Sequence, residues 1–302
     1  MNILQIGKAK SGNFWLYKII QNILQEANIH NSGFLVNHSK YKEIRKLKLS
    51  TEEQNSKDVI DIDNDGIYFR VSSVFKEKIT DFDAYLRHAT HVWSHSRVSK
   101  NTEYAFNNFD KIIYIIRDPR DVLLSMGNFV LSDYMKHYYP NKYKNQNQYV
   151  QYNLLTNCRS WHYHVSDYLR LNYNNLYIIF YENLLSDFDA ELDSLLSFLG
   201  IHLPNSSKSN IKTNCDAEVM KMANPGHVHV PKIYKWKHKL SENQIEKVSY
   251  YIKNTLYGLN YNIYKNEKTK FPYLRDLSFC NEFLKKIDSN LIYEKVLKKL
   301  MR

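Results

Sequence analysis

The chain has 302 residues, of which 42 are Lys or Arg and 31 are Asp or Glu, so its formal net charge is +11. A chain of this length buries a sizeable core, and its positive charge favours anionic partners, either nucleic acid or a phosphorylated cofactor, unless the lysines only cover solvated faces. No apolar run approaches the roughly 18 residues of a membrane span, and no basic and apolar leader opens the sequence, so we expect a cytoplasmic protein. The three cysteines, Cys158, Cys215 and Cys280, lie far apart, which argues against a disulfide framework.

The first residues predict a strand, a glycine turn and a helix. Residues 3–6 are mostly apolar, Gly7 interrupts them, and apolar residues recur at helical spacing over residues 15–24. The first backbone N–H groups of such a helix have no partner within it, and the helix dipole adds positive potential there. Together with Lys10 in the turn, this pattern predicts a phosphate site.

The same turn imitates a Walker A loop without completing it. The spacing from Gly7 to Gly12 fits, but Asn13 and Phe14 stand where that motif has Lys and then Ser or Thr. The hydroxyl that would bind Mg²⁺ beside a triphosphate is therefore missing, which argues against an ordinary ATPase or kinase. Two functions nevertheless stay open at this point. One is a P-loop-type small-molecule or nucleoside kinase, and the other is a basic protein that binds nucleic acid.

The next part of the chain is polar. We expect residues 28–66 to form surface loops with one short helix. Residues 61–66 match the first half of a calcium loop, but Ser72 stands where the bidentate Glu belongs, so we favour a solvated turn. Residues 67–71 predict a strand, residues 75–88 a helix, and residues 90–94 a short strand that ends at His95.

A second unit of strand, turn and helix follows. Residues 112–116 form an unbroken apolar run, which is typical of a strand buried on both faces of a parallel sheet. Arg117 begins the turn, Pro119 suits the first turn of a helix, and Ser125 lies on that helix. Residues 132–153 have no clear period and predict a mobile lid or acceptor loop, with disorder as the alternative.

Another strand is expected between two helices. Residues 156–171 predict a helix, residues 176–180 predict a buried strand that leads into Tyr181, and residues 184–199 predict a helix that ends at Gly200. Strands that alternate with helices indicate an α/β fold with a central, mostly parallel sheet flanked by helices.

The last third of the chain carries weaker signals. Residues 205–235 are loop-like, and nothing near His227 and His229 completes a metal site. Ser241 caps a helix that runs to about Tyr257. Apolar residues recur at helical spacing beyond residue 280, where core packing or a partner helix are both open. We therefore divide the chain into a main domain, residues 1–261, and a helical C-terminal extension, residues 262–302, packed on the same domain.

Four candidate site residues lie just past predicted strands. These are Lys10, His95, Arg117 and Tyr181. Because ligands bind such sheets at the carboxyl ends of the strands, we expect the four side chains to meet at one site.

Two motifs resemble those of the sulfotransferases that use 3′-phosphoadenosine 5′-phosphosulfate (PAPS), in particular their soluble branch. Residues 10–15 read KSGNFW, which is similar to the family's 5′-phosphosulfate loop, usually KSGTTW. Residues 113–125 read IYIIRDPRDVLLS, which is similar to its 3′-phosphate motif. Arg117 lies 22 residues after His95, and Ser125 lies 8 residues after Arg117, as in that family.

The resemblance implies a fold like that of the P-loop-containing nucleotide hydrolases and an enzyme of the sulfotransferase class. Its donor would be PAPS, its product adenosine 3′,5′-bisphosphate (PAP), and its acceptor a hydroxyl or amine of a small molecule, such as a secondary metabolite or a sugar, with no metal. Lys10 and His95 would be catalytic, His95 as general base of an in-line transfer and Lys10 by stabilising developing negative charge. The residues implied to bind the nucleotide are Lys10, Ser11, Gly12, Asn13, Phe14, Trp15, Arg117, Ser125, Tyr181, Lys232 and Trp236.

The resemblance covers residues 1–261 and weakens near their end. Trp161 and residues 180–182 look like family positions. The family usually carries Arg-Lys-Gly or Arg-x-Gly some residues before Trp-Lys, whereas residues 229–231 here are His, Val and Pro. Lys232 or Lys235 would then supply the missing phosphate contact. The expected partner is a small-molecule acceptor, with no nucleic acid and no membrane.

Overall fold

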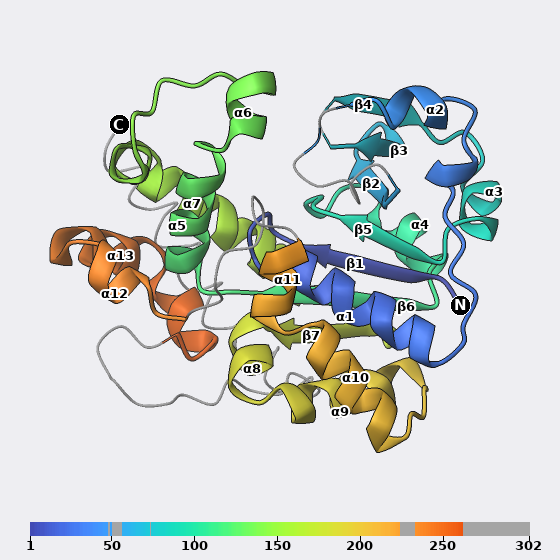
Figure 1. Ribbon diagram of the computed structural model, residues 1–302. Helices are drawn as coiled ribbons and strands as arrows, with labels where there is room; N and C mark the ends of the chain where they lie inside the picture. The colour runs from blue at the N-terminus through green and yellow to red at the C-terminus, as the bar shows by residue number, and fades with distance from the viewer. Residues whose placement is uncertain (48, 50–55, 73, 224–232, 262–302) are drawn as a thin grey trace.

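A seven-stranded sheet forms the centre of the computed structural model, which describes residues 1–47, 49, 56–72, 74–223 and 233–261 (Figure 1). The strand order is β4-β3-β2-β5-β1-β6-β7. Strands β2, β5, β1, β6 and β7 run parallel to one another, and β3 and β4 extend the sheet as antiparallel neighbours. The strands span Ile3–Gly7 (β1), Asp58–Asp63 (β2), Gly66–Val71 (β3), Phe75–Lys78 (β4), His91–Ser94 (β5), Lys111–Ile116 (β6) and Leu176–Phe180 (β7). The prediction of a mostly parallel α/β fold is therefore confirmed.

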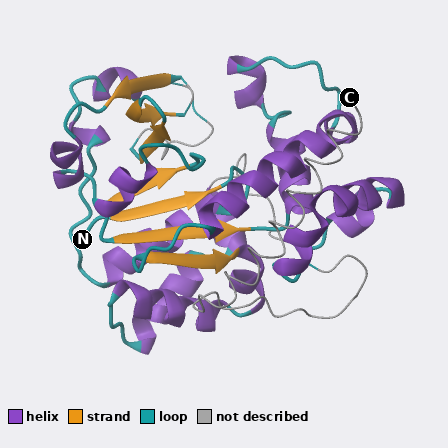
Figure 2. Cartoon of the chain, turned by 180° about the vertical axis from the view of Figure 1, so that it is seen from behind, coloured by secondary structure: helices purple, strands orange, loops and turns teal. Residues whose placement is uncertain are grey.

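Helices cover both faces of the sheet, and Figure 2 shows the same strands side by side from behind. The helices of the first half are α1 (Asn13–Glu26), the 3₁₀ turn η1 (Leu35–Asn37), α2 (Tyr41–Ile44), α3 (Phe82–Arg87), α4 (Thr102–Asn107), α5 (Pro119–Phe129) and α6 (Asp133–Tyr138). Those of the second half are α7 (Gln146–Leu169), α8 (Tyr181–Ser186), α9 (Phe188–Leu199), α10 (Asn205–Asn214), α11 (Ala217–Ala223), α12 (Trp236–Lys239) and α13 (Glu242–Gly258).

The two faces of the sheet bury separate hydrophobic cores, because successive side chains of a strand point to opposite faces. On β6, Ile113 and Ile115 belong to the core beneath α1, α8, α9 and α10. Ile112 and Tyr114 belong to the larger core, which also contains Trp161 of α7. The unbroken apolar run of β6 thus reflects burial on both faces, as predicted.

Local sequence signals set the helix ends next to the sheet. Asp118 caps α5 by accepting a hydrogen bond from the Arg120 backbone N–H, and Pro119 occupies the first turn. Ser241 and Gln244 form a reciprocal capping box on α13, where the predicted helix is confirmed. Gly200 ends α9 in the left-handed conformation.

Four element predictions were wrong in part. Residues 28–66 are not only surface loops with a short helix, because residues 58–63 form strand β2 and pair in parallel with β5. Residues 75–88 do not form one helix: Phe75–Lys78 pairs with β3 as strand β4, and α3 begins only after Asp81, whose carboxylate caps it. Residues 205–223 form α10 and α11 rather than a loop, because Ile211 and Cys215 are buried in the core next to α1. Residues 132–153 are largely helical, in α6 and in an α7 that starts ten residues earlier than predicted.

The aspartates of the calcium-like stretch lie on a hairpin instead of an ion-binding loop. Strands β2 and β3 pair with each other up to Asp63 and Gly66. The carboxylate of Asp61 binds Arg70 and Lys76, and that of Asp63 binds Lys76. These contacts support the solvated turn over calcium. The predicted extension over residues 262–302 and the pair His227 and His229 lie outside the described residues.

Candidate active site

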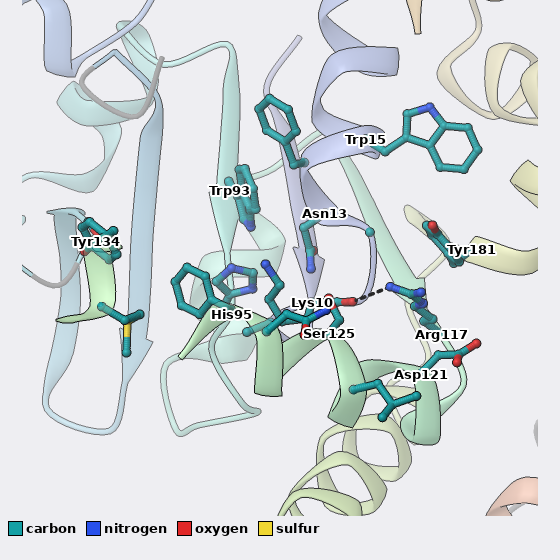
Figure 3. Close-up of a pocket in the computed structure, with 18 of the residues that line it drawn as sticks. Lys10, Asn13, Trp15, Trp93, His95, Arg117, Asp121, Ser125, Tyr134 and Tyr181 are labelled. Carbon is teal, nitrogen blue, oxygen red and sulfur yellow. Dashed lines mark hydrogen bonds between the residues drawn. The ribbon is translucent and has the colours of Figure 1, made fainter. Parts of the chain in front are cut away.

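A cavity of about 810 Å³ opens at the carboxyl ends of the central strands. Figure 3 shows Lys10 and His95 between Trp93 and Tyr134 on one side and Arg117 and Tyr181 on the other. The lining brings together most of the predicted site residues, namely Lys10, Gly12, Asn13, Phe14, Trp15, His95, Arg117, Ser125 and Tyr181.

The turn between β1 and α1 is built to approach a ligand closely. Lys10 and Gly12 both adopt positive φ angles, 72° and 96°. A Cβ atom on Gly12 would lie 2.3 Å from the Tyr181 ring, so glycine is needed here for space as well as for conformation. The turn leads directly into the 14-residue helix α1, whose first N–H groups and dipole favour an anion.

Two polar side chains of this turn differ in their hydrogen bonding: Asn13 is bonded within the turn, and Ser11 is not. Asn13, which replaces the first threonine of the family motif, donates from Nδ2 to the Lys8 carbonyl at 2.8 Å and so closes the turn from inside. The Ser11 hydroxyl is buried and has no hydrogen-bond partner within the described residues. A buried hydroxyl without a partner is unfavourable, and a ligand oxygen would satisfy it.

Lys10 is a half-buried cation. Its ammonium lies 4.5 Å from the centroid of the Phe129 ring, and no carboxylate of the described residues pairs with it. Burial, together with the charge of Arg117, lowers the pKa of Lys10 to about 8. The side chain is therefore still mostly protonated near neutral pH and strongly attracts an anion that enters the cavity.

Arg117 connects the two turns that follow β1 and β6. It donates from Nη1 to the Lys10 carbonyl at 3.1 Å, and its guanidinium lies 4.1 Å from the centroid of the Tyr181 ring. Trp161 donates from Nε1 to the Arg117 carbonyl at 2.9 Å, which fixes the backbone. The Arg117 Nε is buried and unpaired within the part of the chain that the structure describes. Ser125, two turns along α5, lines the same side of the cavity.

His95 follows β5 and is oriented by the backbone of the phosphate turn. Its Nδ1–H donates to the Gly7 carbonyl at 2.5 Å, which leaves Nε2 as the unprotonated nitrogen. Burial, and next the positive charge of Arg70, lower the pKa of His95 to about 4. The imidazole is therefore neutral near pH 7 and able to accept a proton.

Trp15 and Tyr181 form an aromatic wall on the side of Arg117. Their rings meet edge to face at 5.6 Å, and Trp15 also stacks on Phe188 at 6.2 Å. The indole Nε1–H donates to the Cys215 carbonyl at 2.8 Å, so α10 holds Trp15 in place. The α10 helix, which the sequence did not predict, thus positions a predicted site residue.

Two of the predicted site residues in the described part of the chain, Ser11 and Trp236, are not among those that line the cavity. Trp236 does not line the cavity; its buried ring lies 3.6 Å from the Arg120 guanidinium, and its backbone N–H donates to the Asp121 carboxylate at 3.1 Å. It therefore supports the start of α5. Lys232 lies outside the described residues, whereas Lys235 and the unpredicted Lys239 line the cavity.

Further lining residues were missed because their segments gave no motif. Lys57 precedes β2, in residues 28–66, which were expected to form surface loops, whereas Arg70 lies on β3, which was predicted as a strand but not as part of the site. The alternating pattern DVIDID of β2 was the available signal. Asp121 was quoted only as part of the motif, and it is the one carboxylate among the described lining residues.

Two kinds of feature are absent from the described residues. No cluster of three or more His, Cys, Asp or Glu side chains there could hold a metal ion. None of the helices in that part of the chain is both long and apolar enough to cross a membrane.

Comparisons with known proteins identify the family. Residues 2–260 match the model of the sulfotransferase domain. The 3-alpha-hydroxysteroid sulfotransferase of Cavia porcellus is 35% identical over 98 residues, and its 3-beta-hydroxysteroid sulfotransferase is 34% identical over 101 residues. Each alignment covers 32% of this chain and only about a third (33% and 34%) of the length of these curated relatives.

Solved structures support the same fold. A mouse sulfotransferase, SULT7A1, complexed with PAP superposes with a TM-score of 0.55 at 17% identity, over 84% of this chain and 83% of its own. Retinol dehydratase in complex with androsterone and inactive cofactor PAP gives a TM-score of 0.55 at 16% identity, over 90% of this chain and 82% of its own. Because the domain model spans most of the described chain and the fold agrees, the protein belongs to the sulfotransferase family.

Proposed function

We propose that this protein transfers the sulfuryl group of PAPS to a hydroxyl or amine of a small-molecule acceptor. The observation that carries the proposal is one cavity in which a helix N-terminus, the half-buried Lys10 and the buried Arg117 adjoin the neutral imidazole of His95. Family membership supports it, as do the two structural neighbours, which were both solved with PAP.

The residues present fit a nucleotide that carries two separated anionic groups. Lys10, the Ser11 hydroxyl and the N–H groups at the start of α1 would bind the 5′-phosphosulfate, since the Ser11 hydroxyl has no partner in the described chain. Arg117 and Ser125 would bind the 3′-phosphate, with the Arg117 Nε as an available donor. Trp15 and Tyr181 would contact the adenine, and Lys235 or Lys239 would take the place of the missing Arg-x-Gly contact.

His95 and Lys10 would serve opposite ends of the transfer. His95 Nε2 accepts the proton of the acceptor hydroxyl or amine as its oxygen or nitrogen forms a bond to sulfur, and the resulting imidazolium keeps its Nδ1–H bond to Gly7. The bond between sulfur and the phosphate oxygen breaks in line, and the electron pair leaves with PAP. Lys10 stabilises the negative charge that develops on that oxygen.

PAP is expected to bind without metal and more tightly than ADP with Mg²⁺, because Arg117 and Ser125 offer a site for a 3′-phosphate that ADP lacks. We expect dissociation constants on the order of micromolar for PAP by isothermal titration calorimetry. Arg117→Met should weaken PAP binding by roughly tenfold or more and leave ADP binding nearly unchanged.

If ADP with Mg²⁺ bound as tightly as PAP or more tightly, the kinase alternative would be favoured. If neither PAP nor ADP with Mg²⁺ bound, the sulfotransferase and the kinase would both be excluded. The structure already disfavours a kinase, because Asn13 takes the place of the motif's lysine and its Nδ2 is used within the turn.

The affinity for PAP is also expected to decline above about pH 8. The Lys10 pKa is lowered to about 8, so its ammonium is charged below that pH and neutral above it. Bound phosphate stabilises the charged form, so complex formation above pH 8 takes up a proton. Calorimetry in buffers of different ionisation enthalpy measures this uptake. Lys10→Arg, which stays charged, should abolish both the decline and the uptake, whereas a wild-type affinity that stays constant up to about pH 10 would contradict the assignment.

A further inference from the structure

One face of helix α7 is bonded to the three segments that carry the site. These segments follow β1, β5 and β6, and residues four apart on a helix share one face. The bonds join Ser160 to Lys8 (2.9 Å), Trp161 to Arg117 (2.9 Å), His164 to His95 (3.3 Å) and Tyr168 to Ser96 (2.8 Å). A single helix therefore ties together the turns that present the cations and the base.

Two side chains of this face, His164 and Tyr168, bind the backbone at the base itself. The His164 Nε2 lies 3.3 Å from the His95 carbonyl oxygen, and the Tyr168 hydroxyl donates to the next carbonyl, that of Ser96, at 2.8 Å. Both side chains are buried, and neither lines the cavity. They therefore act on the site through the backbone at His95, not through contact with a ligand.

The direction of the His164 bond follows from its protonation. Burial lowers the pKa of His164 to about 3, so near pH 7 its imidazole is neutral and has one N–H. A carbonyl oxygen can only accept, so Nε2 carries this proton and donates a hydrogen bond to the His95 carbonyl. Nδ1 then accepts from the Tyr114 hydroxyl at 2.8 Å. The Tyr114 O–H thus selects the tautomer that the bond to His95 requires.

Packing alone does not account for a histidine at this position. Its neighbours in the larger core are mostly apolar or aromatic, and a buried imidazole is unfavourable unless its nitrogens are bonded. The His164 ring stacks with that of Tyr114 at 5.7 Å, and Tyr114 stacks with Tyr168 at 4.5 Å. The three packed rings keep the donors of His164 and Tyr168 in place beside the segment that follows β5.

The position of the His95 Nε2 depends on two attachments. The bond from Nδ1 to the Gly7 carbonyl fixes one side of the ring, and the backbone fixes the point from which the side chain starts. A general base must lie within hydrogen-bond reach of the proton that it takes, and a displacement of about 1 Å can slow a reaction by about 10²-fold. Resting on the proposed function, we infer that His164 and Tyr168 are positioning residues, which hold the His95 backbone so that Nε2 meets the acceptor.

Two amides at position 164 separate the bond to His95 from the bond to Tyr114. In His164→Gln the amide nitrogen takes the place of Nε2 and can still donate to the His95 carbonyl. The shorter side chain of His164→Asn takes the place of Nδ1, so it can bond the Tyr114 hydroxyl but does not reach His95.

The transfer step is measured in single turnovers with saturating PAPS and 4-nitrophenol as acceptor, by mass spectrometry of the sulfated product. We expect His164→Asn to slow it by about 10–10²-fold, and His164→Gln to stay within about threefold of the wild type. Calorimetry should find the affinity for PAP nearly unchanged in both variants, because neither replacement touches Lys10 or Arg117.

A double-mutant cycle distinguishes positioning from a general structural defect. Because His164 is inferred to act through His95, His164→Asn should change the rate of His95→Asn by no more than about threefold, whereas a structural defect would slow both backgrounds alike. Tyr168→Phe removes one hydroxyl and keeps the ring, so it should show the same pattern with a loss of about three- to tenfold. His162→Asn is the control on the same helix, since His162 binds the Thr255 hydroxyl instead.

NMR of the His95 imidazole gives a readout that needs no acceptor. Its ¹⁵N signals in the PAP complex are assigned by their loss in His95→Asn. They should show the Nδ1–H form in the wild type and in His164→Gln. In His164→Asn they should average toward the other tautomer, because a displaced backbone lengthens the bond to the Gly7 carbonyl.

The inference is overturned if His164→Asn transfers at the wild-type rate, if it slows His95→Asn as much as the wild type, or if His95 keeps the Nδ1–H form in it. The proposed function would survive each of these results. If the wild type neither binds PAP nor yields sulfated product, the proposed function fails and this inference fails with it. If PAP binds but 4-nitrophenol is not sulfated, the NMR comparison decides. If His164→Asn does not fold, the same measurements on Tyr168→Phe decide.

Discussion

Replacement of His95 by Asn is expected to lower the rate of sulfuryl transfer by about 10²–10⁴-fold, the usual contribution of a general base. The Asn amide can still donate to the Gly7 carbonyl that now accepts from Nδ1–H, so the shape of the site should persist. It has no equivalent of Nε2, so the acceptor proton has no receiver. Single-turnover mass spectrometry measures the transfer step, and calorimetry should find PAP affinity nearly unchanged.

His162→Asn is the matched control for this variant. His162 is also a histidine whose pKa burial lowers to about 4, but it binds the Thr255 hydroxyl and does not line the cavity. Its replacement should leave the transfer rate unchanged. A His95→Asn enzyme that transfers at the wild-type rate, or that loses PAP binding, would contradict the role of general base.

The pH dependence gives an independent test of the same residue. With a pKa near 4, His95 stays unprotonated through the range where an ordinary histidine titrates, near 6.5. The wild-type kcat/KM for the acceptor, measured as a function of pH, should therefore show no inflection from His95 near pH 6.5. An inflection near pH 6.5 that is present in the wild type and absent in His95→Asn would contradict the lowered pKa of His95.

The strongest local patterns predicted β1, β3, β5, β6, β7 and the turn around Gly12 correctly. The buried runs of β1 and β6, the turn around Gly12 and the Pro119 start of α5 each depend on residues close in sequence. Since the carboxyl ends of parallel strands share one edge, the meeting of Lys10, His95 and Arg117 followed from these units alone. Their convergence on one cavity confirms that step.

Features that depend on distant segments were not predictable in this way. The order of the strands places Lys57 and Arg70 at the cavity, and no local pattern encodes that order. The α10 sequence, NSSKSNIKTN, has only Ile211 buried within the helix, so its amphipathic signal was too weak. The Trp-Lys pair at Trp236 suggested a nucleotide contact, whereas Trp236 is not among the residues that line the cavity and its ring packs against Arg120.

Replacement of Lys10 by Met is expected to slow the transfer step by about 10²–10³-fold, as for the loss of one donor to a developing oxyanion. The affinity for PAP should fall less, by roughly tenfold, because the charge that Lys10 opposes on the leaving oxygen increases only in the transition state. Met is unbranched like Lys, so the strain of the positive φ angle at this position is unchanged. It also keeps an apolar contact with the Phe129 ring.

Lys8→Met provides the control within the same turn. The Lys8 ammonium binds the Ser160 hydroxyl at 2.9 Å and does not line the cavity, so its loss should not slow the transfer step. Single-turnover rates at saturating PAPS, compared with PAP affinities from calorimetry, separate catalysis from binding. If Lys10→Met slowed the transfer no more than it weakened PAP binding, Lys10 would act by holding the nucleotide alone. The stabilisation of the leaving phosphate would then have to come from the Ser11 hydroxyl and the N–H groups at the start of α1.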